Sequence, residues 1–78
     1  DCVKIDGKYI RDALNSARDE AMVRNLARMC QDLGVTTVAE MVETQEQLDY
    51  LIGIGVDKAQ GWIFGKPTAK AEYQKRDK

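Results

Sequence analysis

The 78-residue chain contains no histidine, two cysteines and one proline, and the first two scarcities exclude several kinds of chemistry. Without histidine there is no Ser–His–Asp triad, no Cys–His catalytic pair and no histidine-ligated zinc site. Cys2 and Cys30 form no CxxC pair, which excludes thiolate zinc sites and thioredoxin-like redox chemistry. We expect two buried free thiols in a reducing cytosol, with a disulfide between them as the alternative. Any catalytic chemistry must therefore use carboxylates, lysine, amides and a hard cation.

The chain also lacks a long apolar run and an excess of charge of either sign. No segment approaches the ~20 apolar residues of a membrane span, and no signal-peptide pattern opens the sequence. Twelve basic and thirteen acidic residues give a net charge of −1, without the basic stripe typical of nucleic-acid binding. We therefore expect a soluble, cytoplasmic segment with no nucleic-acid partner and no membrane span.

Short β-type segments alternate with amphipathic helical segments. Apolar alternation and β-branched runs predict strands near residues 2–6, 35–40 and 56–61. Helical periodicity predicts helices near residues 17–33, 45–53 and 68–75, with a brief helical turn over residues 9–14. The expected order is strand–helix–strand–helix–strand–helix.

Capping residues mark the two best-defined helices. Ser16 is a typical N-cap of the first, and Gly34 supplies a left-handed stop at its end. Thr44 and Gln47 form a capping box ahead of the second. The first helix is expected to bury one apolar stripe, made of Met22, Leu26, Met29, Cys30 and Leu33.

Alternation of strands and helices predicts parallel strands joined by right-handed crossovers. An open doubly wound sheet and an eight-stranded barrel both use this pattern. Three strands do not close a barrel, and they leave two edges and one face of the sheet uncovered. We therefore interpret the 78 residues as a fragment of a larger α/β domain.

Polar side chains stand at the carboxyl ends of the predicted strands, where parallel α/β folds place their active sites. Strand alternation places Lys4 opposite the apolar side chains of its own strand, and Glu40 on the same side of the second strand. Gln60 ends the third strand. A lysine, a carboxylate and an amide that converge in this way suit a phosphate, a divalent cation held by Glu40 and an activated water.

Simpler structural roles compete with this interpretation. Lys4 and Glu40 form, in the alternative, only a buried ion pair. Asp6 precedes a glycine and is more typical of a turn or helix cap than of a catalytic acid. Glu43 is more typical of a first-turn residue that interacts with the helix dipole than of a second base. Gln60 is a weak signal by itself.

Three motifs in order resemble the end of the EAL domain, a family of phosphodiesterases and receptors for the bacterial messenger cyclic di-GMP. They are Val3-Lys4-Ile5-Asp6-Gly7, Val38-Ala39-Glu40-Met41-Val42-Glu43-Thr44, and Gln60-Gly61-Trp62-Ile63-Phe64 with Pro67. The resemblance covers nearly the whole chain and rests on all three motifs at their separations.

The resemblance implies a TIM-type barrel of eight parallel strands, of which residues 1–78 are the last three strand–helix units. It implies that Lys4 steadies the attacking water and a phosphate oxygen. Glu40 then corresponds to a metal ligand or general base, and Gln60 to an amide that lines the substrate site. Mg²⁺ or Mn²⁺ is the implied cofactor, with most of its ligands upstream of Asp1.

The function implied for the complete domain is metal-assisted hydrolysis of cyclic di-GMP to the linear dinucleotide. The isolated segment is expected to be inactive. The implied partners are cyclic di-GMP, the remainder of the barrel in the same or a complementing chain, and a second copy in a homodimer. A small standalone interaction module is a third interpretation of the chain.

Met41 departs from the family pattern, which usually has glycine at this position. A left-handed backbone there would strain a residue that has a side chain and would misplace Glu40. Met41 therefore favours the alternative function, a degenerate EAL domain that binds cyclic di-GMP as a non-catalytic receptor. The presence of Lys4, Glu40 and Gln60 favours the enzyme.

Overall fold

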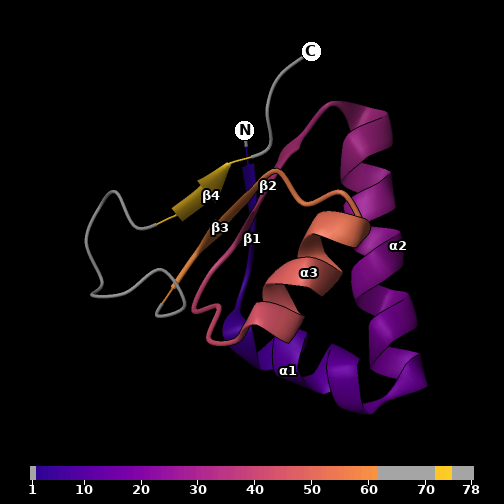
Figure 1. The fold of residues 1–78 in the computed structure, drawn as a ribbon. Coiled ribbons are helices and arrows are strands. Elements are labelled where there is room, and N and C mark those ends of the chain that lie inside the picture. Colours follow the sequence, from indigo (N-terminus) through magenta and orange to yellow (C-terminus); the bar gives the residue numbers. More distant parts are fainter. Residues whose placement is uncertain (1, 62–71, 75–78) are drawn as a thin grey trace.

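In the part of the chain that the computed structural model describes, residues 2–61 and 72–74, one sheet carries helices on one of its faces (Figure 1). The elements are, in chain order, β1 (Cys2–Ile5), α1 (Gly7–Asn15), α2 (Ala17–Leu33), β2 (Thr36–Ala39), α3 (Gln45–Gly53), β3 (Lys58–Gln60) and β4 (Glu72–Gln74). The sheet order is β1-β2-β3-β4, in which β1, β2 and β3 are parallel and β4 is antiparallel to β3. The carboxyl ends of the parallel strands therefore meet at one end of the sheet.

Helices α2 and α3 cover the ranges that the capping signals predict. Ser16 Oγ accepts a hydrogen bond from the backbone N–H of Asp19 at 3.3 Å, and Gly34 ends α2 with φ 72°. Thr44 Oγ1 accepts a hydrogen bond from the N–H of Gln47 at 3.1 Å, which completes the predicted capping box of α3. No helix within the described residues is long and apolar enough to cross a membrane.

Helix α1 is longer than the brief turn predicted over residues 9–14. It spans nine residues and begins at Gly7, because the carboxylate of Asp6 caps it. Asp6 Oδ1 accepts a hydrogen bond from the N–H of Lys8 at 2.9 Å. The capping role that the sequence favours for Asp6 is therefore confirmed.

The helix predicted over residues 68–75 is wrong at residues 72–74, which form strand β4. This strand pairs with β3 in the register Ala59↔Tyr73. The backbone groups along the edge of β3 gain partners from an antiparallel strand, and a helix would leave them without these hydrogen bonds. The other residues of the predicted helix lie outside the described ranges. Strands β1, β2 and β3 fall within the three predicted strand segments.

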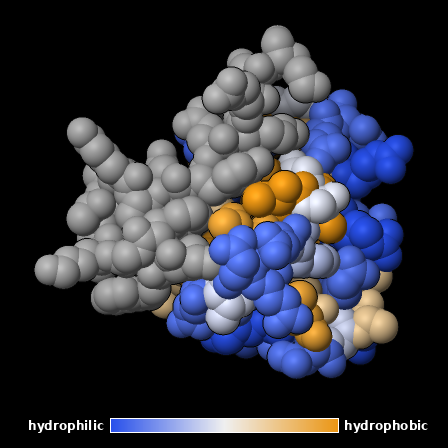
Figure 2. Space-filling model, in the orientation of Figure 1, coloured by the Kyte–Doolittle hydropathy of each residue, from blue (hydrophilic) through white to orange (hydrophobic). Residues whose placement is uncertain are grey.

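Apolar side chains fill the space between the sheet and the helices. Ile5, Ala39 and Ala59 are 2%, 0% and 0% exposed and form the strand side of this core. The core is completed by Ile10, Ala27, Val42, Leu48, Leu51 and Val56. On the face drawn in Figure 2, polar residues cover most of α2, and the visible apolar residues form one group near the end of α3 and a second group lower in the view.

The buried face of α2 differs from the predicted stripe. Its buried residues are Val23, Ala27 and Cys30, of which only Cys30 belongs to that stripe. Leu26, another member, is partly buried and packs against the core. The other three are half or more exposed, at 54% for Met22, 51% for Met29 and 69% for Leu33. The small buried residues allow α2 to approach its neighbours closely, and the larger side chains are left on an adjacent stripe of the helix.

Both cysteines are free, so the alternative of a disulfide between them is not realised. Cys30 is buried as predicted, but the prediction is wrong for Cys2, which is exposed. Cys2 begins β1, a strand whose outer edge has no neighbour among the strands described.

Candidate active site at the carboxyl ends of the parallel strands

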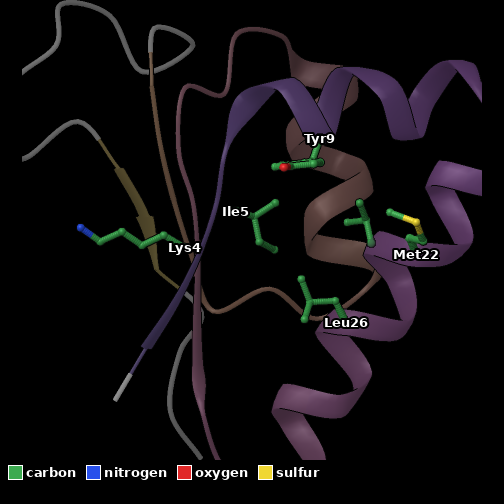
Figure 3. A pocket seen from close by; sticks show the side chains of 6 residues that line it. Lys4, Ile5, Tyr9, Met22 and Leu26 are labelled. Atoms are coloured by element: carbon green, nitrogen blue, oxygen red, sulfur yellow. The ribbon is translucent and has the colours of Figure 1, made fainter.

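Lys4, Glu40 and Gln60 all stand at the end of the sheet where β1, β2 and β3 finish. Lys4 lies in β1, Glu40 directly follows β2, and Gln60 is the last residue of β3. In Figure 3 the side chain of Lys4 points away from the helices, whereas that of Ile5 points toward them. This opposition follows from strand alternation and places Lys4 on the sheet face that the helices do not cover.

Lys4 and Glu40 are brought into contact. The Nζ atom of Lys4 lies 3.8 Å from Oε2 of Glu40, and the two side chains are 65% and 37% exposed. Within the described residues this ion pair is therefore exposed, unlike the buried pair of the structural alternative. Exposed ion pairs contribute only about 0–1 kcal/mol to stability, so both charges are open to a ligand at little cost.

Gln60 lies on the strand next to Glu40 and is exposed. The register pairs Ala39 with Ala59, which places the following residues, Glu40 and Gln60, side by side at the ends of their strands. The backbone carbonyl oxygen of Gln60 accepts a hydrogen bond from the backbone N–H of Val42 at 2.8 Å. The structure thus gathers the three predicted site residues at one end of the sheet, with a side-chain contact between Lys4 and Glu40.

The residue after Glu40 has an unusual backbone conformation. Met41 has φ 62°, in the left-handed region, and is the one non-glycine residue with positive φ in the described ranges. This conformation costs a residue with a Cβ atom roughly 1–2 kcal/mol. The sequence-based expectation of strain at this position is therefore met, yet Glu40 still faces Lys4.

Glu43 lies before the N-cap of α3 rather than in its first turn, which corrects its predicted position. Its N–H donates a hydrogen bond to Oε1 of Gln47 at 2.7 Å. Its carboxylate lies 4.0 Å from Nη1 of Arg11 on α1. The sequence provides no local signal for this contact, because Arg11 and Glu43 belong to different elements that only the fold brings together.

A second polar cluster stands in the β2–β3 region and was not predicted. Asp57 Oδ2 accepts hydrogen bonds from the N–H and the hydroxyl of Thr37, at 2.9 and 3.2 Å. Thr37 Oγ1 accepts a hydrogen bond from the N–H of Asp57 at 3.0 Å. Thr37 is fully buried, so these bonds satisfy polar groups inside the fold and join the start of β3 to β2.

The residues described do not by themselves make a metal site. No three Asp, Glu or Cys side chains among them lie close enough together to hold a metal ion. Glu40 is a single carboxylate next to an ammonium group, whereas Mg²⁺ and Ca²⁺ take six or more oxygen ligands. A divalent cation at Glu40 therefore needs further oxygen ligands from outside the described residues.

The geometry above coincides with a family match over most of the chain. The family model for the EAL domain matches residues 1–67. The chain belongs to the EAL domain family. Among curated relatives, the cyclic di-GMP phosphodiesterase PdeB of Shewanella oneidensis is 42% identical over 73 residues, which cover 94% of this chain and 8% of PdeB.

Solved EAL structures have the same fold over the aligned region. An EAL domain protein from Listeria monocytogenes aligns with a TM-score of 0.79 and 34% identity, covering 86% of this chain and 27% of that one. The manganese and cyclic di-GMP complex of Klebsiella pneumoniae BlrP1 aligns with a TM-score of 0.74 and 41% identity, covering 82% of this chain and 16% of that one. The chain thus spans less than a third of the length of each of these three proteins.

Proposed function

We propose that this chain supplies Lys4, Glu40 and Gln60 to the active site of a cyclic di-GMP phosphodiesterase. The observation that carries the proposal is the 3.8 Å contact between Lys4 and Glu40 at the carboxyl ends of adjacent parallel strands. That place is where barrels of this kind carry their catalytic groups. The EAL relative PdeB is named as an enzyme of this activity, and BlrP1 was solved with this dinucleotide.

In the reaction, water attacks one phosphodiester and forms a new P–O bond. The P–O bond to one ribose breaks, and the ribose oxygen that leaves takes up a proton, which gives a linear dinucleotide. The ammonium group of Lys4 neutralises charge on a phosphate oxygen and orients the water. The carboxylate of Glu40 accepts the proton of the attacking water. The Gln60 amide lines the site and contacts the substrate. Mg²⁺ or Mn²⁺ belongs to the same proposal, with Glu40 as one ligand among several supplied by the rest of the domain.

The rest of the domain is proposed to be the remainder of an eight-stranded barrel, in the same or a complementing chain. Beside β1 lies a hollow of about 170 Å³ (Figure 3). It is lined by Lys4, Ile5, Tyr9, Met22, Val23 and Leu26. Exposed apolar residues continue from it along α2 at Met29 and Leu33. A further strand and helix would bury this surface, and we expect the isolated segment to be inactive without them.

The receptor function is the second candidate, and Met41 is the observation that favours it. Glu40 keeps its contact with Lys4 in spite of the left-handed Met41, and PdeB is named as a phosphodiesterase. These observations support the enzyme over the receptor. A homodimer and a cytoplasmic location remain predictions from the sequence.

The test uses the longest native protein that contains this chain, mixed with cyclic di-GMP and Mn²⁺. Binding and the linear product are measured in the same sample, for the wild type and for Glu40→Gln. Glu46→Gln, an exposed glutamate of α3, is the matched control. We expect product from the wild type and the control but not from Glu40→Gln. Tight binding without product would overturn the phosphodiesterase in favour of the receptor.

A further inference from the structure

Two glycines flank the loop that carries Glu40. Gly7 follows β1 at the start of α1, and Gly61 follows β3. Between them runs the backbone that leaves β2. The N–H of Glu40 donates to the carbonyl oxygen of Ile5, and the N–H of Val42 donates to that of Gln60, both at 2.8 Å. The loop is therefore tied to the strands on both sides.

Neither glycine leaves room for a side chain. A Cβ atom added to Gly7 would lie 2.9 Å from the Cβ atom and 3.0 Å from the carbonyl oxygen of Met41. A Cβ atom added to Gly61 would overlap the backbone of Val42 and lie 2.9 Å from the carbonyl carbon of Met41. Carbon atoms normally pack about 3.5–4.0 Å apart, so a side chain at either position would push the loop.

Gly7 is the more informative of the two, because its backbone does not require glycine. Its φ is not positive, unlike that of Gly61 at 152°. It is the first residue of α1, where alanine has the higher helix propensity. What excludes a side chain at Gly7 is contact with the loop, and the nearest atom is the Cβ of Met41, which a glycine at position 41 would lack.

We propose that Gly7 is a positioning residue, which makes room for Met41 so that the left-handed loop after β2 holds Glu40 opposite Lys4. Gly61 confines the same loop from the side of β3. Positions 7 and 41 are thus coupled through the 2.9 Å contact with the Cβ atom of Met41, whereas the backbone oxygens of Met41 and Glu40, at 3.0 and 3.2 Å, meet a side chain at Gly7 whatever residue stands at position 41. The kinetic consequence rests on the proposed phosphodiesterase, whereas the placement of Glu40 rests on geometry alone.

The test compares Gly7→Ala, Met41→Gly and the double variant in the native protein that contains this chain. Gly53→Ala is the matched control, because a Cβ atom there meets nothing within 4 Å. Crystal structures report the distance from Lys4 Nζ to Glu40 Oε2, and hydrolysis of cyclic di-GMP with Mn²⁺ reports kcat and KM. We expect Gly7→Ala to lengthen the distance and to lower kcat roughly tenfold or more, with a smaller change in KM.

The double variant decides between positioning and general damage to the fold. We expect it to recover part of the loss in distance and kcat, because removing the Cβ atom of Met41 relieves the shortest contact while the two backbone oxygens remain, and we expect Gly53→Ala to match the wild type. Should Gly7→Ala fail to fold, recovery of folding in the double variant supports the coupling, and no recovery overturns it. The proposal is also overturned if the distance from Lys4 Nζ to Glu40 Oε2 in Gly7→Ala equals that in the wild type. A wild type without hydrolysis refutes the phosphodiesterase alone, since the crystal structures still decide the role of Gly7.

Discussion

Lys4 and Glu40 stand on adjacent parallel strands with Nζ and Oε2 3.8 Å apart, and both side chains remain open to solvent. The strands themselves are joined by the backbone ladder that pairs Cys2–Ile5 with Thr36–Ala39. The ion pair is therefore not what holds β1 to β2. Its charges lie at the end of the sheet where the carboxyl ends of three strands meet, which is where parallel α/β folds carry their functional groups.

This relationship predicts that activity and stability respond differently to the loss of Lys4. In the complete domain, Lys4→Met should lower kcat about 100-fold, because a charged donor to the phosphate is lost. The free energy of unfolding should change by about 1 kcal/mol or less, because the backbone ladder rather than the ion pair joins β1 to β2. Steady-state kinetics and urea denaturation measure the two effects. Arg28→Met removes a charge that is 75% exposed on α2 and should alter neither. Parallel losses of stability and activity in Lys4→Met would contradict the prediction.

Met41→Gly should stabilise the protein. Glycine adopts φ 62° without the Cβ penalty, so the free energy of unfolding should rise by about 1 kcal/mol. Met29→Gly is the matched control, because the two methionines are 52% and 51% exposed. In the interior of α2 this change should lower the free energy of unfolding by about 0.5–1 kcal/mol. If urea denaturation shows that both variants change the free energy of unfolding in the same direction, left-handed strain at Met41 is excluded as the cause of the change in Met41→Gly.

Asp57→Ala should destabilise the fold without touching the candidate site. It removes the acceptor for the N–H and the hydroxyl of Thr37, a residue that is fully buried. An unsatisfied buried donor costs about 1–3 kcal/mol and two donors are affected, so the free energy of unfolding should fall by at least about 1–3 kcal/mol. Asp32→Ala, an aspartate 68% exposed on α2, should change it by less than about 0.5 kcal/mol. If Asp57→Ala lowers the free energy of unfolding no more than Asp32→Ala does, the hydrogen bonds between Asp57 and Thr37 contribute nothing to stability.

Tyr50 should make stability depend on pH in the alkaline range. Burial, with a hydrogen bond from its hydroxyl to Oε2 of Glu20 at 3.1 Å, raises the pKa of Tyr50 from 10.0 to about 12. A pKa raised by folding means that the contribution of Tyr50 is complete below pH 10 and is lost as pH rises from 10 toward 12. Measured across this pH range, the free energy of unfolding should fall more steeply for the wild type than for Tyr50→Phe. Identical slopes would contradict the raised pKa.

Much of the fold follows from signals that are local in the sequence. Ser16 and Thr44 begin α2 and α3 where predicted, because an N-cap depends only on the side chain and the backbone of the next turn. Lys4 and Glu40 face the same side because alternation along a strand has a period of two. Residues 72–74 form a strand rather than the predicted helix because their partner is the distant edge of β3.

By itself, the sequence determined the two longest predicted helices, the parallel strand segments and the position of Lys4, Glu40 and Gln60 near the carboxyl ends of those segments. These depend on periodicity and capping over a few neighbouring positions. Only the tertiary structure decided which face of α2 is buried, that Asp57 pairs with Thr37, and that Gly7 lies against Met41. These are contacts between elements far apart in the chain, and their geometry is set by close packing of the whole fold rather than by any local pattern.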